Sequence, residues 1–170
     1  MSSVARNILV LALVLGASAA PADVIDRIMA VVGGRTITLS DVNAALLFHQ
    51  IRPPAEVKDT AGYAVERLIE RTLMLAEVER FQPPEPDPVE ITIRVDALER
   101  GAGSAAAFDK LLAVTGLTRD QLRRQIRDDL RVATYLNQRF GATESSEREA
   151  SVKSWLVELR KRADVTVVRP

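Results

Sequence analysis

The residue types that most often perform catalysis are scarce in this sequence. Its 170 residues include no cysteine and one histidine, His49, which argues against thiolate nucleophiles, Cys-ligated metals and Ser-His or paired-histidine sites. Two carboxylate pairs, Glu66 with Glu70 and Asp128 with Asp129, have the residue type needed for general acid-base catalysis. Arginines interleave with both pairs, so surface ion pairing is the expected role. A carboxylate-dependent hydrolase is a minor alternative, and we expect a non-enzymatic protein that uses no cofactor and no metal.

A basic stripe is the other chemical feature of the sequence. Arginines recur every four residues at Arg119, Arg123, Arg127 and Arg131, a spacing that places them on one face of a helix. Such a face could bind DNA. Aspartates are interleaved with the stripe, however, and the 23 basic residues of the chain are balanced by 23 acidic ones. The pattern favours a solvated, salt-bridged face and no nucleic-acid partner.

Residues 1–22 have the pattern of a secretory signal peptide. Arg6 precedes an apolar run over residues 8–15, and small residues follow the run. The run is shorter than the roughly 20 residues that cross a bilayer. Cleavage sites after Ala19 and Ala22 compete, and we favour the second. We therefore expect export to a bacterial periplasm, with no stable membrane insertion after cleavage.

The elements that must position these residues are mostly helical. Hydrophobic periodicity, capping residues and turn residues predict a hairpin turning at Gly33-Gly34, followed by helices over 40–51, 60–81, 105–114, 118–139 and 146–163. Residues 89–95 alternate like a strand but follow a helix-start signal at Asp87-Pro88, and we prefer a helix. A strand over 165–168 is too short to be stable alone and must pair with the hairpin. The predicted fold is mostly α, with a small sheet that unites both chain ends.

The sequence also predicts how this mature chain, residues 23–170, is divided. The proline-rich connector 82–88 separates a first lobe, 23–81, from a second lobe, 89–170. The helix expected over 40–51 is apolar on two faces, so it is either sandwiched in a core, which we favour, or presents one face to a partner. His49 lies on this helix, and we expect it to be structural or exposed to solvent.

Four segments, in this order, resemble the SurA family of periplasmic chaperones and peptidyl-prolyl isomerases. They are VIDRIMAVVGGRTITLSDVNAAL (24–46), VERLIERTLMLAEVER (65–80), FDKLLAVTGLTRDQLRRQIRDDL (108–130) and WLVELRKRADVTVV (155–168). In that family the N- and C-terminal parts form one core that holds unfolded outer-membrane proteins, and parvulin-type isomerase domains are inserted between them. Residues 138–146 are too few for an insertion of about one hundred residues. The resemblance therefore implies the chaperone core without isomerase activity.

The function expected from these observations is binding of extended, aromatic-rich segments of unfolded polypeptides, without ATP, in a groove between the two lobes. The candidate groove residues are apolar and suit a promiscuous surface; they are Leu47, Phe48, Ile51, Met74, Phe81, Phe108 and Tyr135. The alternative is a non-catalytic periplasmic adaptor or assembly subunit that binds one specific folded partner. A chaperone would bind several unrelated unfolded proteins, whereas an adaptor would bind one protein.

Overall fold

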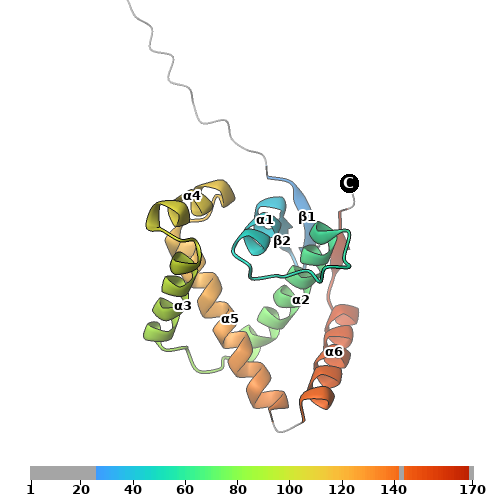
Figure 1. The fold of residues 1–170 in the computed structure, drawn as a ribbon. Coiled ribbons are helices and arrows are strands. Elements are labelled where there is room, and N and C mark those ends of the chain that lie inside the picture. The colour runs from blue at the N-terminus through green and yellow to red at the C-terminus, as the bar shows by residue number, and fades with distance from the viewer. Residues whose placement is uncertain (1–25, 142–143, 169–170) are drawn as a thin grey trace, which may run out of the picture.

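A computed structural model describes residues 26–141 and 144–168 of the chain. The predicted signal peptide and its cleavage sites lie outside these residues. The elements follow in the order β1 (Ile28–Val32), β2 (Arg35–Thr38), α1 (Leu39–Leu47), α2 (Thr60–Phe81), α3 (Pro88–Gly101), α4 (Ala105–Thr115), α5 (Arg119–Phe140), α6 (Ser145–Arg162) and β3 (Val165–Val167) (Figure 1). The predicted fold class, mostly α with a small sheet, is confirmed.

The sheet joins the first and last strands of the described chain. Its strand order is β2-β1-β3, and both pairs are antiparallel. Gly33 and Gly34 form the turn between β1 and β2 with φ of 54° and 81°, a left-handed region that glycine enters without a Cβ penalty. β3 pairs with β1 so that Val167 lies opposite Ala30. The predicted pairing of the C-terminal strand with the hairpin is confirmed.

The larger hydrophobic core lies between the sheet, α2 and α6. Ile69 and Val78 of α2 and Ala30 of β1 have no exposed surface, and Trp155 of α6 packs in the same cluster. Trp155 is thus a packing anchor of this core. α6 and β3 therefore share a core with α2 and the sheet of the predicted first lobe, and also with Tyr135 and Phe140 of α5 from the predicted second lobe.

A smaller core joins α1, α3, α4 and the first half of α5. The ring of Phe108, which is fully buried, meets Phe48 edge to face with 5.9 Å between ring centroids. α1 contributes Val42 to the larger core and Ala44 with Phe48 to the smaller one. The helix that is apolar on two faces is therefore sandwiched between the cores, which was the favoured alternative.

Several predicted helix boundaries are confirmed because local signals determine them. α2 covers residues 60–81, as predicted. Residues 89–95 are helical within α3, where the Asp87 carboxylate accepts a hydrogen bond from the Val89 N–H at 2.8 Å. α5 begins near the predicted residue 118, where Thr118 and Gln121 form a capping box. These ends depend on side chains within four residues of one another, which sequence patterns report directly.

Other boundaries differ from the prediction. α1 is capped by Thr38 rather than Ser40, because Asp41 completes a capping box with Thr38. It ends at Leu47 rather than near Ile51, since His49 turns to φ 53° and the Ile51 N–H bonds back to the Ala45 carbonyl. α6 begins at Ser145, one residue before the predicted start at 146, and has no side-chain cap.

Removal of β3 should destabilise the whole fold. A chain that ends at Ala163 leaves the β1 edge unpaired and uncovers Ala30 and Val32, so we expect the free energy of unfolding to fall by about 3 kcal/mol, out of roughly 5–15 kcal/mol for a domain. Urea denaturation followed by circular dichroism measures the change. A chain lacking only residues 169–170 is the matched control and should unfold like the full chain. Equal midpoints for all three chains would contradict this account of the topology.

Candidate functional site

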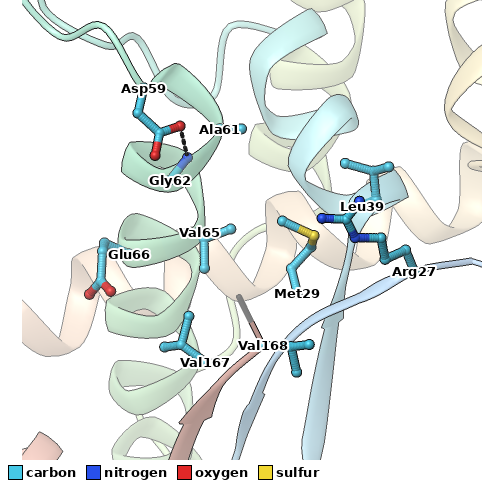
Figure 2. Close-up of a pocket in the computed structure, with 10 residues that line it drawn as sticks. All are labelled: Arg27, Met29, Leu39, Asp59, Ala61, Gly62, Val65, Glu66, Val167 and Val168. Carbon is cyan, nitrogen blue, oxygen red and sulfur yellow. Dashed lines mark hydrogen bonds between the residues drawn. The ribbon is translucent and has the colours of Figure 1, made fainter. Parts of the chain in front are cut away.

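An open cavity of about 620 Å³ lies between the sheet and the N-terminal part of α2 (Figure 2). Its volume is within the roughly 300–1,000 Å³ that is usual for ligand sites. Most of its lining is apolar and comes from Met29, Leu39, Ala61, Val65, Val167 and Val168; Arg27, Asp59, Gly62 and Glu66 complete it. The cavity is therefore suited to apolar side chains.

Val167 shows that the core is left open at this place. It lies opposite Ala30 in the sheet, and partners in neighbouring strands point to the same face. Ala30 is fully buried against the core, whereas Val167 is 39% exposed. Figure 2 shows Val167 of β3 and Val65 of α2 bordering the same space. No described residue covers Val167 from outside, and uncovered apolar surface of this kind is typical of a binding site.

Small residues at the start of α2 leave room for the cavity. Asp59 is the N-cap of α2 and accepts a hydrogen bond from the Gly62 N–H at 2.8 Å. A Cβ atom at Gly62 would lie 2.2 Å from a carboxylate oxygen of Asp59, so a larger residue there would disturb the cap. Ala61 adds a single methyl group to the lining. The two residues of the first turn that line the cavity, Ala61 and Gly62, are therefore too small to fill the space beside β3.

The carboxylates around the cavity are engaged by the protein itself. Asp59 caps α2, and Glu66 accepts hydrogen bonds from Arg160 of α6. Glu70, the other member of the first carboxylate pair, binds Arg67 at 2.7 Å. These contacts match the surface ion pairing predicted for Glu66 and Glu70. Neither Asp59 nor Glu66 is therefore free to act as an acid or a base at the cavity.

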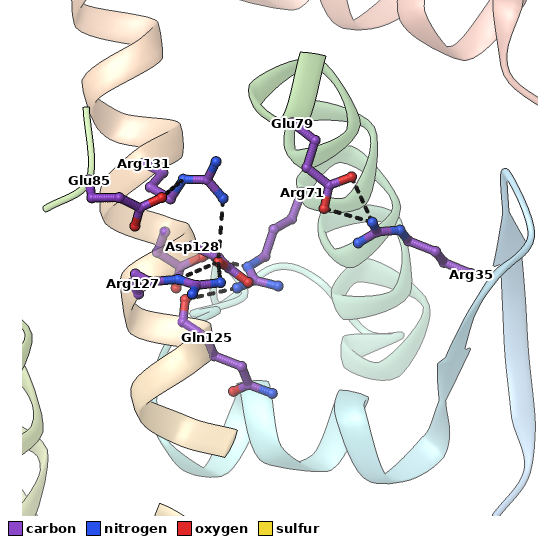
Figure 3. A network of polar contacts seen from close by, with 9 residues as sticks. Arg35, Arg71, Glu79, Glu85, Gln125, Arg127, Asp128 and Arg131 are labelled. Atoms are coloured by element: carbon purple, nitrogen blue, oxygen red, sulfur yellow. Dashed lines mark hydrogen bonds and ion pairs between the residues drawn. The ribbon is translucent and has the colours of Figure 1, made fainter. Parts of the chain in front are cut away.

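A second cluster of polar side chains connects α2 with α5 (Figure 3). Arg71 of α2 donates hydrogen bonds to the Asp129 carboxylate and, at 3.0 Å, to the Gln125 carbonyl. Arg35 of β2 borders the same hollow as Arg71 and donates to both oxygens of Glu79 at 2.7 Å. The cluster joins three elements through charge-assisted bonds. We interpret it as a structural clamp, because each of these charged groups has a partner within the protein.

The basic stripe of α5 is also neutralised by acidic partners. These are Glu99 and Asp109 for Arg119, Asp128 for Arg127, and Glu85 with Asp128 for Arg131. Arg123 instead lies 3.3 Å from the Thr92 hydroxyl. The predicted salt-bridged face is thereby confirmed for three of the four arginines. Among the described residues, no group of three or more His, Asp or Glu side chains is placed to hold a metal ion, and none of the described helices is long and apolar enough to cross a membrane.

The structure does not bring the seven predicted groove residues together in one groove, although Phe48 contacts Phe108 and Phe81 contacts Tyr135. Phe48, Phe108 and Tyr135 have exposed fractions of 4%, 0% and 5%, so their expected exposure in a groove is wrong and they are core residues. Ile51 and Met74 are partly buried against the larger core. Leu47 and Phe81 are exposed, at the ends of α1 and α2. None of the seven lines the cavity beside β3.

Sequence reasoning missed the cavity because it searched for large aromatic side chains. An aromatic residue in an amphipathic helix gives the same pattern whether it lies in a core or in a groove. The available signals were weaker. One is the pair of small residues, Ala61 and Gly62, at the start of a helix otherwise rich in large apolar residues. The other is the run of valines at the C-terminal strand, which exceeds what one buried face of a strand requires.

Comparisons with known proteins do not assign the chain to a family or a function. No protein-family model matches the chain, and no curated protein is significantly similar to it in sequence.

The clamp residue Asp129 should make stability depend on pH. Burial between helices raises the pKa of Asp129 above its ordinary value, although Arg71 opposes the shift. The folded protein then holds this proton more tightly than the unfolded chain, so the stability contributed by Asp129 is complete at acidic pH and decreases as the pH rises through the folded-state pKa. We expect Asp129→Asn to gain stability relative to the wild type as the pH rises from about 3 to 6.

Urea denaturation at several pH values measures this difference. Asp96→Asn, which changes an exposed aspartate of α3, is the matched control and should follow the wild-type profile. A constant difference between Asp129→Asn and the wild type over that range would contradict the assigned direction.

Proposed function

We propose that this protein is an ATP-independent periplasmic chaperone module that binds extended apolar segments of unfolded polypeptides, with the cavity beside β3 as its client site. The observation that carries the proposal is the open cavity of about 620 Å³ with an apolar lining and a core-facing valine left 39% exposed. Unfolded chains present apolar side chains that gain about 25 cal/mol for each Å² removed from water. Export is expected from the signal-peptide pattern, and the resemblance to the SurA family supports the client class.

The size of the cavity sets the strength of binding. One or two client side chains fit in such a space, and each contributes about 1.5–3 kcal/mol on burial. The client must be ordered on binding, which offsets part of this gain. We therefore expect micromolar or weaker affinity, about −8 kcal/mol at most. Weak binding allows the client to be released without nucleotide hydrolysis.

The alternative is a non-catalytic adaptor that binds one folded partner. It is favoured by Val89 and Ile93 of α3, which lie one helical turn apart and are 63% and 57% exposed. An exposed apolar helix face of this kind fits the groove or flat surface of a folded protein. The two functions thus use different surfaces of the molecule, and variants of each surface distinguish them.

Filling the cavity should weaken client binding and chaperone activity. We expect the wild-type protein to suppress aggregation of several unrelated unfolded β-rich proteins at near-stoichiometric ratio without nucleotide. Ala61→Phe places a ring in the cavity and should raise the dissociation constant for a client about tenfold, or about 1.4 kcal/mol. Light scattering measures aggregation, and fluorescence anisotropy of a labelled client measures affinity. Ala113→Phe, on an exposed position of α4, is the matched control and should bind like the wild type.

Two results would overturn the proposal. If Ala61→Phe and Ala113→Phe bind clients equally, with unchanged circular dichroism spectra, clients do not use this cavity. If the wild type leaves the aggregation of all clients unchanged but binds one folded periplasmic protein, and Ile93→Ser abolishes that binding, the protein is an adaptor.

A further inference from the structure

The open edge of the sheet adjoins the same cavity. We propose that a client segment binds as an additional β-strand along the free edge of β3 and inserts one of its side chains into the cavity. This inference rests on the proposed function of the cavity and specifies its ligand, which is an extended segment recognised mainly through its backbone.

The free edge is defined by the order of the strands. β3 is the last strand in the order β2-β1-β3, and no described residue forms a backbone hydrogen bond with its outer side. A strand at an edge presents unpaired N–H and C=O groups, which form a template for a further strand. Figure 1 shows β3 at the side of the sheet away from β2. The edge therefore offers hydrogen bonds that any extended polypeptide can accept and donate.

Two hydrogen bonds establish which groups of β3 face outward. The Gly33 N–H donates to the Asp164 carbonyl at 2.8 Å, and the Val168 N–H donates to the Met29 carbonyl at 2.9 Å. In an antiparallel ladder such bonds flank the pairs that are not themselves hydrogen-bonded. These pairs are Val32 with Val165 and Ala30 with Val167. The backbone groups of Val165 and Val167 consequently point away from β1, toward the open edge.

The same residue that offers its backbone also borders the cavity. Val167 presents its N–H and C=O at the edge, and its side chain lines the space beside α2. Residues that lie side by side in neighbouring strands have their side chains on one face of the sheet. A client residue beside Val167 must therefore direct its side chain toward α2. One extended segment can pair with the edge and fill the cavity at the same time.

The cavity and the edge together select the client. The lining beside the edge strand is apolar, with Val167 and Val168, and the carboxylates of Asp59 and Glu66 are already bonded within the protein. We expect an apolar client residue beside Val167, with little preference for the residues that point to the other face. A second copy of the chain is a weaker occupant, because a strand of three residues contributes little of the roughly 1,000 Å² that a stable interface requires.

Amide hydrogen exchange measured by NMR tests the proposed strand. The ligand is an end-blocked eight-residue peptide of alternating valine and threonine, with an additional lysine at each end for solubility. At saturating peptide, exchange of the Val165 and Val167 amides should slow about tenfold or more, because these amides acquire acceptors. The amides of Thr166 and Val168 already face β1 and should change much less.

N-methylated peptides supply the matched control. One peptide carries N-methyl groups on alternate residues and a second carries them on the intervening residues, so both have the same apolar side chains. We expect one methylation pattern to raise the dissociation constant at least tenfold and the other to leave it nearly unchanged, since successive N–H groups of a strand point to opposite sides.

Each other outcome overturns the inference in a distinguishable way. If the peptide displaces an unfolded client but both methylated peptides bind equally and the Val165 and Val167 amides stay unprotected, the cavity is the client site and strand addition is wrong. If neither peptide nor client binds the wild-type protein, the proposed function itself fails. If the two amides become protected without peptide as the protein concentration rises, the edge pairs with a second copy.

Discussion

The antiparallel pairing of β3 with β1 is the contact on which the rest of the structure depends. It brings the last strand of the described chain beside the first, and it holds α6 against α2, where Trp155 and Leu159 complete the larger core. The same pairing creates one wall of the cavity. This wall consists of Val167, the last residue of β3, and Val168, which follows it. Fold closure and the candidate site therefore share one short strand.

The two cores are coupled because single helices pass through both. α5 contributes Leu122 and Ile126 to the smaller core and Val132 to the larger one, and α1 lies between them. The Arg71 clamp adds hydrogen bonds between α2 and α5. A groove that opens between two independent lobes does not agree with this packing, because opening it would break continuous helices or separate the paired charges of Arg71 and Asp129. The candidate site lies instead at the margin of the larger core.

The sequence predicted what local interactions determine and failed where distant segments decide. The limits of α2 and the capping box of Thr118 follow from neighbouring residues, and the pairing of β3 followed from the instability of an isolated short strand. The packing of α6 against α2 was not predicted, because it joins two helices about 80 residues apart in the chain. Phe108 was assigned to a groove because amphipathic spacing shows that a residue packs, but not whether protein or ligand covers it.

The cavity persists at a cost in stability, and this cost argues for a function. Covering Val167 fully would remove apolar surface from water and contribute on the order of 1 kcal/mol to the free energy of unfolding. A larger side chain at position 61 could provide that cover from α2, where the chain has Ala61 and Gly62 instead. Binding sites commonly retain such unfavourable exposure, because apolar surface that the protein already covers contributes no binding free energy when a ligand arrives. An extended client that pairs with β3 would supply both the missing apolar contact and the missing hydrogen bonds, so one occupant would complete the core and the sheet together.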